Sequence, residues 1–128
     1  MSFSIKINHG DRIIVYVHQG SITKEDIGAA WVELLALPEF SAGGYHLLSD
    51  YRQAEFQITP AEVHAISDYL AGIAEILNGK RQAILVHDPH DTAITYLFSA
   101  EVLQRIGFIV KAFSTEAAAL HWLSRDNL

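Results

Sequence analysis

The final third of the chain limits the fold most strongly, because strand and helix patterns alternate there with short connections. Residues 81–87 form a buried run typical of a strand, and residues 91–106 carry apolar side chains at helical spacing. A second strand-like run, 108–113, and a helical segment, 114–124, complete the chain. Strands separated by helices pair in parallel, so this order predicts an α/β protein with a parallel sheet.

The first half of the chain predicts a hairpin and then further strand–helix units. Phe3, Ile5 and Ile7 alternate with polar residues, and an apolar run over 13–17 follows a turn, which predicts an antiparallel hairpin with the first strand at the sheet edge. A third strand is expected over 45–50. The full order is ββαβαβαβα: a mixed, mostly parallel five-stranded sheet with four helices, in one domain over residues 1–128.

Polar residues mark the expected helix ends. Thr59-Pro60-Ala61-Glu62 is a capping box with proline at the first helical position, and Thr23 precedes acidic residues. The helix that starts at Thr59 is expected to end at Asn78-Gly79, and Gly107 should end the next one. In the last helix, the residues expected to face the sheet are Ala118, Trp122 and Leu123.

Charge and composition exclude several classes of protein. Nine Lys and Arg against fifteen Asp and Glu give a net charge of −6, which disfavours nucleic acid and anionic membranes as partners. The chain has no cysteine, which excludes disulfides and thiolate metal sites, and a cytoplasmic location is expected. No apolar run approaches the length of a membrane span. No pattern requires a cofactor or a resident metal.

Two segments carry a resemblance to a known family. The first segment resembles a third strand that ends in aspartate before a polar turn: His46-Leu47-Leu48-Ser49-Asp50-Tyr51-Arg52-Gln53-Ala54. The second, residues 113–123, resembles a C-terminal segment that consists of Phe, an acidic Ala-rich helix and a final Trp-Leu pair. Together they are similar to the uncharacterised bacterial SpoIIAA-like proteins, relatives of STAS domains. The resemblance implies the SpoIIAA-like fold and a binding or regulatory module, and it implies no known reaction.

The same resemblance directs attention to Thr59. Anti-sigma-factor antagonists of the STAS group carry an Asp-Ser-Ser phosphoacceptor at the start of the second helix, whereas this chain has Ile58-Thr59-Pro60. Thr59 is the hydroxyl at the matching position, and a phosphate there would lie at a helix N-terminus. The alternative is that Thr59 only caps the helix.

Polar residues gather in two predicted loops. His87-Asp88-Pro89-His90-Asp91 follows the fourth strand, where ligands of open α/β sheets bind, and offers imidazoles and carboxylates suited to a metal. Asp50, Arg52 and Glu55 are expected in the loop after the third strand, on the same edge. If the loops converge, they form a ligand site from Asp50, Arg52, His87, Asp88 and His90; the alternative is local turn structure.

A second apolar stripe on the third main helix predicts a protein contact. Tyr96, Ala100 and Leu103 lie opposite the face that packs on the sheet, so we expect a homodimer through them and a non-enzymatic association module. A second hypothesis is a binder of a small apolar, lipid-like ligand, because STAS-like and lipid-carrier folds resemble each other; its pocket would be lined by Trp31, Ile73 and Phe98. A third is a metal-dependent enzyme using His87, Asp88, His90 and Asp91.

Overall fold

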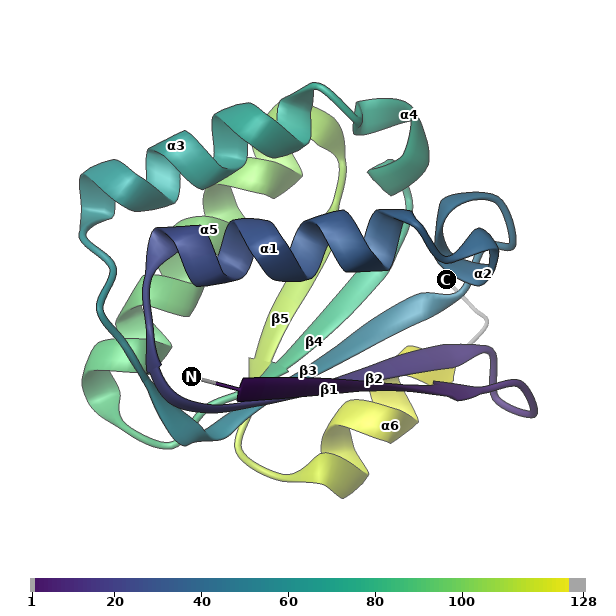
Figure 1. Ribbon diagram of the computed structural model, residues 1–128, viewed down its shortest axis with the longest axis horizontal. Helices are drawn as coiled ribbons and strands as arrows, with labels where there is room; N and C mark the ends of the chain where they lie inside the picture. The colour runs from purple at the N-terminus through teal and green to yellow at the C-terminus, as the bar shows by residue number, and fades with distance from the viewer. Residues whose placement is uncertain (1, 125–128) are drawn as a thin grey trace.

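The computed structural model describes residues 2–124, which form one sheet with helices on both sides (Figure 1). The strands are β1 (Ser2–Asn8), β2 (Ile13–Ile22), β3 (His46–Phe56), β4 (Arg81–Leu85) and β5 (Ile109–Phe113). The helices are α1 (Lys24–Leu35), α2 (Pro38–Ser41), α3 (Pro60–Ala71), α4 (Ala74–Leu77), α5 (Pro89–Ile106) and α6 (Glu116–Ser124). The predicted order is confirmed, with the short helices α2 and α4 added.

The five strands lie in the order β1-β2-β3-β4-β5. β1 pairs antiparallel with β2, so that Ile5 lies opposite Tyr16, and every later pair is parallel. β1 is an edge strand, as its alternating pattern predicted. The parallel pairing brings the carboxyl ends of β2 to β5 to one edge of the sheet, where polar loops meet.

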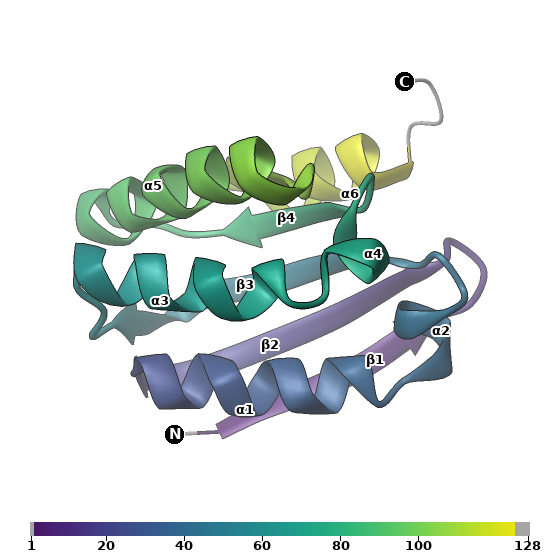
Figure 2. The ribbon, with the colours of Figure 1, turned by 90° about the horizontal axis from the view of Figure 1, so that it is seen from above.

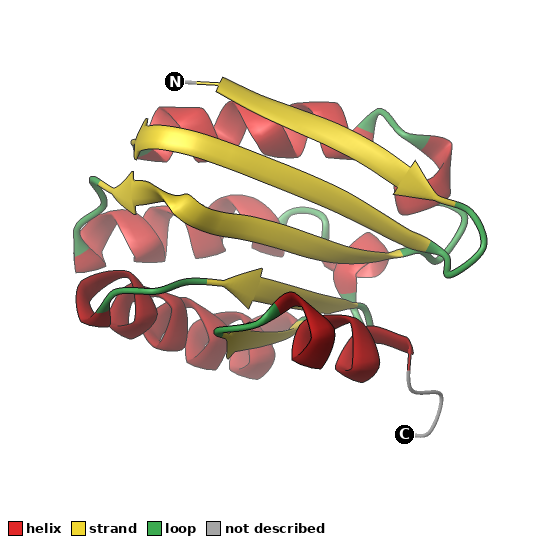
Figure 3. Cartoon of the chain, turned by 90° about the horizontal axis from the view of Figure 1, so that it is seen from below, coloured by secondary structure: helices red, strands yellow, loops and turns green. Residues whose placement is uncertain are grey.

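The helices cover the two faces of the sheet unequally. α1, α3 and α5 lie on the face that we call the upper face, and α6 lies on the lower face (Figure 1). From above, the three upper helices run side by side over the strands (Figure 2). From below, α6 lies beside β4 and β5, while no helix of residues 2–124 lies beneath β1 and β2 (Figure 3).

Each face has its own core because side chains alternate along the strands. Leu47 points into the upper core and Leu48 into the lower core, and both are fully buried. In the upper core the ring of Trp31 lies 5.9 Å from that of Phe40 and 6.0 Å from that of Phe108, centroid to centroid. The smaller lower core is Ile13, Leu48, Ala83, Leu85, Ala119 and Leu123.

The predicted helix starts at Thr23 and Thr59 are confirmed. The Thr59 hydroxyl accepts a hydrogen bond from the amide of Glu62 at 3.2 Å, and the Glu62 carboxylate accepts one from the Thr59 amide at 3.0 Å. α5 begins two residues earlier than predicted, because Asp88 caps it by accepting from the amide of Asp91 at 2.7 Å. Gly107 ends α5 with φ at +69°, a conformation that favours glycine.

Two predicted boundaries are wrong. β3 continues to Phe56, so Asp50, Arg52 and Glu55 lie in a strand and not in a loop. The strand extends because it pairs with β2 as far as Ile22, which a local pattern cannot reveal. The helix expected to run to Asn78 breaks at Gly72, a poor helix former, and resumes as the single turn α4.

The expected inner face of the last helix is also partly wrong. Leu123 is buried as predicted and Trp122 is half-buried, but Ala118 is exposed and its neighbour Ala119 faces the sheet. A run of three alanines carries no polar contrast, so periodicity does not fix the rotation of this helix. Within residues 2–124, none of the helices combines the length and the apolar character needed to span a bilayer.

Candidate functional site

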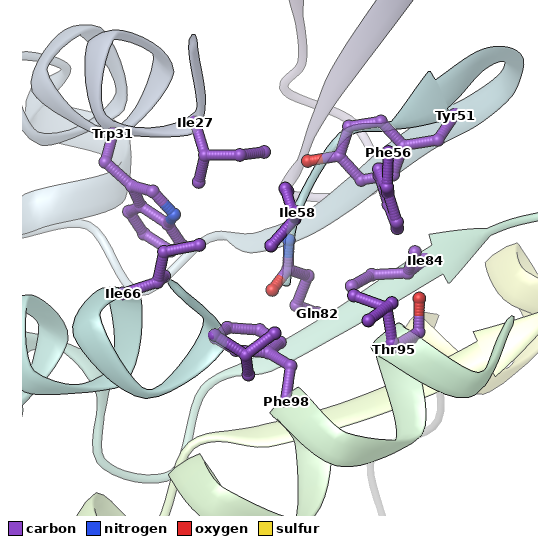
Figure 4. A pocket seen from close by; sticks show the side chains of 12 residues that line it. Ile27, Trp31, Tyr51, Phe56, Ile58, Ile66, Gln82, Ile84, Thr95 and Phe98 are labelled. Carbon is purple, nitrogen blue, oxygen red and sulfur yellow. The ribbon is translucent and has the colours of Figure 1, made fainter. Parts of the chain in front are cut away.

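A small apolar cavity lies between the upper face and the three helices that cover it. Its volume is about 50 Å³. Trp31 and Phe98 line it as predicted, whereas Ile73 does not, because α3 ends before that residue. The lining side chains converge from α1, α3, α5 and the central strands (Figure 4): Ile27, Trp31, Tyr51, Phe56, Ile58, Val63, Ile66, Gln82, Ile84, Ile94, Thr95 and Phe98.

One polar side chain in this cavity has an unused hydrogen-bonding atom. Gln82, on β4, is 3% exposed, and its Nε2 donates to the Ser49 hydroxyl at 2.9 Å. Its Oε1 accepts no hydrogen bond from any group within residues 2–124. Thr95 is satisfied, since its hydroxyl donates to the Asp91 carbonyl at 2.8 Å. Burial raises the pKa of the neighbouring Tyr51 hydroxyl above its usual range, so Tyr51 stays neutral.

A groove between α1 and α3 adjoins the cavity. It measures about 280 Å³ and shares Ile27, Trp31 and Ile66 with the cavity. Gly28 contributes no side chain to its wall, and a Cβ added there would meet no atom within 4 Å. The groove and the cavity are therefore neighbours along α1 and α3, and we call the two together the recess; Lys24 and Glu25 also line the groove.

On the lower face, Asp50 and Arg52 are bonded to each other. Arg52 donates through Nε and a terminal guanidinium nitrogen to the two Asp50 carboxylate oxygens, at 3.0 and 2.8 Å, and its backbone amide also donates to Asp50 at 3.0 Å. The β2–β3 register shifts next to these residues, between Val17 and Gln19. Asp50 thus satisfies a backbone amide at a bulge, which is a local structural role.

The expected ligand site is divided by the sheet. Asp50, Arg52 and His87 do come together, in a hollow of about 320 Å³ that also includes Val17 and Gln53. Asp88 and His90 line a different groove, with Thr59. The hydrogen bond from Arg52 holds the pKa of Asp50 below its usual range, which keeps this carboxylate charged.

The groove at the start of α5 holds the group of side chains with metal-ligand potential. One ligand atom each from Asp88, His90 and Asp91 lies within 4.8 Å of the others. These atoms already have structural partners: Asp88 caps α5, and Asp91 accepts from the Phe56 amide at 3.3 Å and contacts His90 at 3.1 Å. A bound metal would share these carboxylates with those bonds, and His87 lines a different hollow.

The surroundings of Thr59 are unfavourable for a phosphate. Its hydroxyl is exposed, but the Glu62 carboxylate lies 3.4 Å from it. The groove beside it is lined by three more carboxylates, those of Glu55, Asp88 and Asp91. These charges oppose the attraction of the helix N-terminus. Modification of Thr59 stays a prediction.

The outer side of α5 matches the predicted apolar stripe. Tyr96 is 60% exposed and Leu103 is 55% exposed, and Ala100 lies exposed between them. The side of α5 toward α3 is already occupied: Arg105 donates to Ser67 at 2.8 Å and pairs with Asp68 at 2.8 Å. The stripe is therefore free of α3.

Sequence reasoning did not single out Gln82 or two histidines that the fold encloses. His18 lies buried within β2 and is bonded to the Tyr16 hydroxyl. His46 is half-buried, and its Nδ1 accepts from the Arg81 amide at 3.0 Å. One feature of the sequence could have indicated Gln82: it is a polar residue inside the run 81–87, which is expected to be buried on both faces.

The comparisons agree with a SpoIIAA-like fold. The chain is similar to an uncharacterized protein of the DUF3478 family, with a SpoIIAA-like fold, from Shewanella loihica PV-4, at 20% identity over 95% of this chain and 92% of that one (TM-score 0.58). It is also similar to the anti-sigma factor antagonist SpoIIAA in its unphosphorylated form, at 12% identity over 95% and 97% of the two chains (TM-score 0.56). No protein-family model matches the sequence, and no curated protein matches it.

Proposed function

We propose that this protein is a non-enzymatic, regulatory protein-association module that works as a homodimer through the outer side of α5. The observation that carries the proposal is the exposure of Tyr96 and Leu103 on a helix whose other sides are packed. Large exposed apolar side chains grouped on one helix face are typical of a protein contact. The SpoIIAA-like fold supports a module of this general kind.

A second copy of the chain is the occupant that this face suits best. The midpoint of the segment from Tyr96 to Leu103 falls between Ser99 and Ala100. Two α5 helices that cross antiparallel at this point would therefore place Tyr96 of each copy against Leu103 of the other. The small Ala100 side chain at the centre permits close approach of the helices.

Charge also favours this face for self-association. Each copy carries a net charge of −6, so two copies repel each other over most of their surfaces. The residues along the exposed stripe are uncharged, so contact there avoids placing like charges together: Ala93, Tyr96, Leu97, Ala100, Leu103 and Gln104.

The side chains with catalytic potential support a non-enzymatic role because they serve the local structure. Asp50 and Arg52 hold the β3 bulge, and Asp88 caps α5. A cytoplasmic location belongs to the same proposal, since a chain without cysteine gains nothing from an oxidising compartment.

The test is Leu103→Asp, measured by analytical ultracentrifugation over a range of concentrations. The buried unpaired carboxylate should weaken the dimer at least about 100-fold, a loss near 3 kcal/mol, without changing the circular dichroism of the monomer. Val32→Asp is the matched control, because Val32 is 62% exposed on α1, away from the stripe. The interface is wrong if wild type is monomeric at high concentration or if Leu103→Asp keeps the wild-type assembly.

A further inference from the structure

The recess between α1, α3 and the sheet points to a second property of the protein, separate from self-association through α5. We propose that it binds a slender, neutral, apolar molecule with a hydroxyl end, such as an unbranched aliphatic alcohol, whose hydroxyl donates to the Gln82 carbonyl. Gln82 lines the cavity, and the neighbouring groove lies between α1 and α3. The proposal does not depend on the dimer.

The buried position of Gln82 is the first observation that supports this proposal. A buried amide carbonyl without a donor costs free energy that a well-packed core avoids. Figure 4 shows the Gln82 oxygen directed into the space bounded by Ile58, Ile66 and Phe98. The amide nitrogen is held by Ser49 at 2.9 Å, which fixes the direction of the oxygen. A ligand that supplies one donor at this point would complete the hydrogen bonding of Gln82.

The shape of the recess selects the rest of the ligand. A cavity of about 50 Å³ is smaller than the roughly 150 Å³ known to admit benzene, so a ring does not fit at its inner end. A single aliphatic chain is thinner than a ring and can continue into the groove of about 280 Å³. The walls that such a chain would touch are apolar, chiefly Trp31, Ile66 and Phe98.

Charge limits the class of ligand further. An ionised fatty acid presents only acceptors, which would face the Gln82 carbonyl oxygen, itself an acceptor. None of the described residues that line the cavity carries a charge that could neutralise a carboxylate. A hydroxyl is neutral and donates one hydrogen bond, so an alcohol matches the inner end where a carboxylate does not.

The first measurement compares n-octanol, n-octane and octanoate as probes of the wild-type protein. Binding is followed by chemical-shift changes of the Gln82 side-chain amide and by contacts from the probe chain to Ile66 and Phe98 in NMR spectra. We expect octanol to bind at these residues and octanoate to bind at least about 10-fold more weakly. Equal or tighter binding of octanoate, or no octanol contact at these residues at saturation of the buffer, would overturn the proposal.

The second measurement uses Gln82→Met, which keeps the length of the side chain and removes its carbonyl. The ratio of octanol affinity to octane affinity should fall by about 10-fold, because the octanol hydroxyl loses its acceptor while the chain contacts remain. An unchanged ratio would show that the carbonyl does not anchor the hydroxyl.

A third pair of variants avoids the buried strand, in case Gln82→Met does not fold. Gly28→Leu places a side chain in the groove without a backbone clash, since a Cβ at Gly28 meets nothing within 4 Å. It should reduce octanol binding at least about 10-fold. Ala29→Leu, the next residue and exposed on the same helix, is the matched control and should bind octanol as wild type does. Equal binding by both variants would exclude the groove as the route.

Discussion

On the lower face of the sheet Asp50 and Arg52 satisfy each other, whereas on the upper face the Gln82 carbonyl has no partner within residues 2–124. The first arrangement is partly open to solvent: the side chains of Asp50 and Arg52 are 18% and 30% exposed. The second lies in a cavity that side chains of α1, α3 and α5 also line. The Asp50–Arg52 pair is satisfied by its own two members, whereas a buried acceptor left unpaired by residues 2–124 calls for a donor from elsewhere.

The difference follows from how the two faces are covered. Three helices on the upper face meet along their sides and leave space where their side chains do not interlock, above β4. The single helix on the lower face lies against a small core, and polar residues occupy the part of the face that it leaves open. Apolar volume and polar surface are therefore separated by the sheet.

The largest expected effect on stability comes from truncating Leu47 in the upper core, and its neighbour Leu48 allows the same test in the lower core. Leu47→Ala should lower the free energy of unfolding by about 4 kcal/mol, because the upper core is held by three helices and cannot close around the lost atoms. Leu48→Ala should cost about 2 to 3 kcal/mol, because α6 can settle onto the smaller lower core. Urea unfolding of both variants measures the difference. A larger loss for Leu48→Ala would mean that α6 is fixed more rigidly than the upper helices.

A smaller effect on stability tests the ion pair between Asp50 and Arg52 on the lower face. Arg52→Ala should cost about 2 kcal/mol at neutral pH, because it leaves the Asp50 carboxylate without its guanidinium partner. Because the folded pKa of Asp50 is lowered, its contribution is complete above the unfolded pKa of about 3.9 and is lost as pH falls through the folded value. The gap between wild type and variant should therefore shrink in urea unfolding below about pH 4.

Gln53→Ala is the matched control for this pair, since Gln53 lies exposed in the same hollow but makes no bond to Asp50. It should change the unfolding free energy by less than about 0.5 kcal/mol at any pH. A gap for Arg52→Ala that stays constant down to pH 3 would mean that packing of the arginine stem, and not its charge, stabilises this part of β3.

Sequence patterns predicted the elements well where local chemistry decides them. The caps at Thr23 and Thr59 and the end of α5 at Gly107 depend on residues within one helical turn, and these were confirmed. The extension of β3 to Phe56 depends on pairing with a strand more than thirty residues away, and it was missed. Local patterns carry no information about such partners.

The candidate sites were harder to predict for a related reason. The sequence placed Asp50, Arg52 and His87 near one edge, and the structure brings them together, but it puts His90 in another groove. Which side of the sheet a loop residue reaches depends on where its helix begins, and α5 begins earlier than expected. The unpaired atom of Gln82 was beyond reach, because hydrogen-bond satisfaction depends on every neighbour in three dimensions.

The smallest expected effect on stability concerns His18, on the upper face. Its Nε2 is also buried without a partner among the described residues. Burial lowers the pKa of His18, so the folded protein holds it neutral while the unfolded chain takes up a proton below about pH 6.5. Stability should therefore fall as pH is lowered from 7.5 to 5.5, by about 1 kcal/mol for this group. His46, whose pKa burial also lowers, adds to the wild-type slope.

His18→Gln isolates the contribution of His18 because it removes the titrating ring and leaves His46 in place. Its unfolding free energy is expected to depend on pH less steeply than that of wild type, whatever its absolute stability. Gln19→Ala, at an exposed and non-titrating neighbour of His18 in β2, is the control and should keep the wild-type slope. Equal slopes for wild type and His18→Gln would mean that the folded protein accommodates a charged His18. The upper face would then tolerate buried charge, and the argument that selects a neutral ligand for its cavity would lose its support.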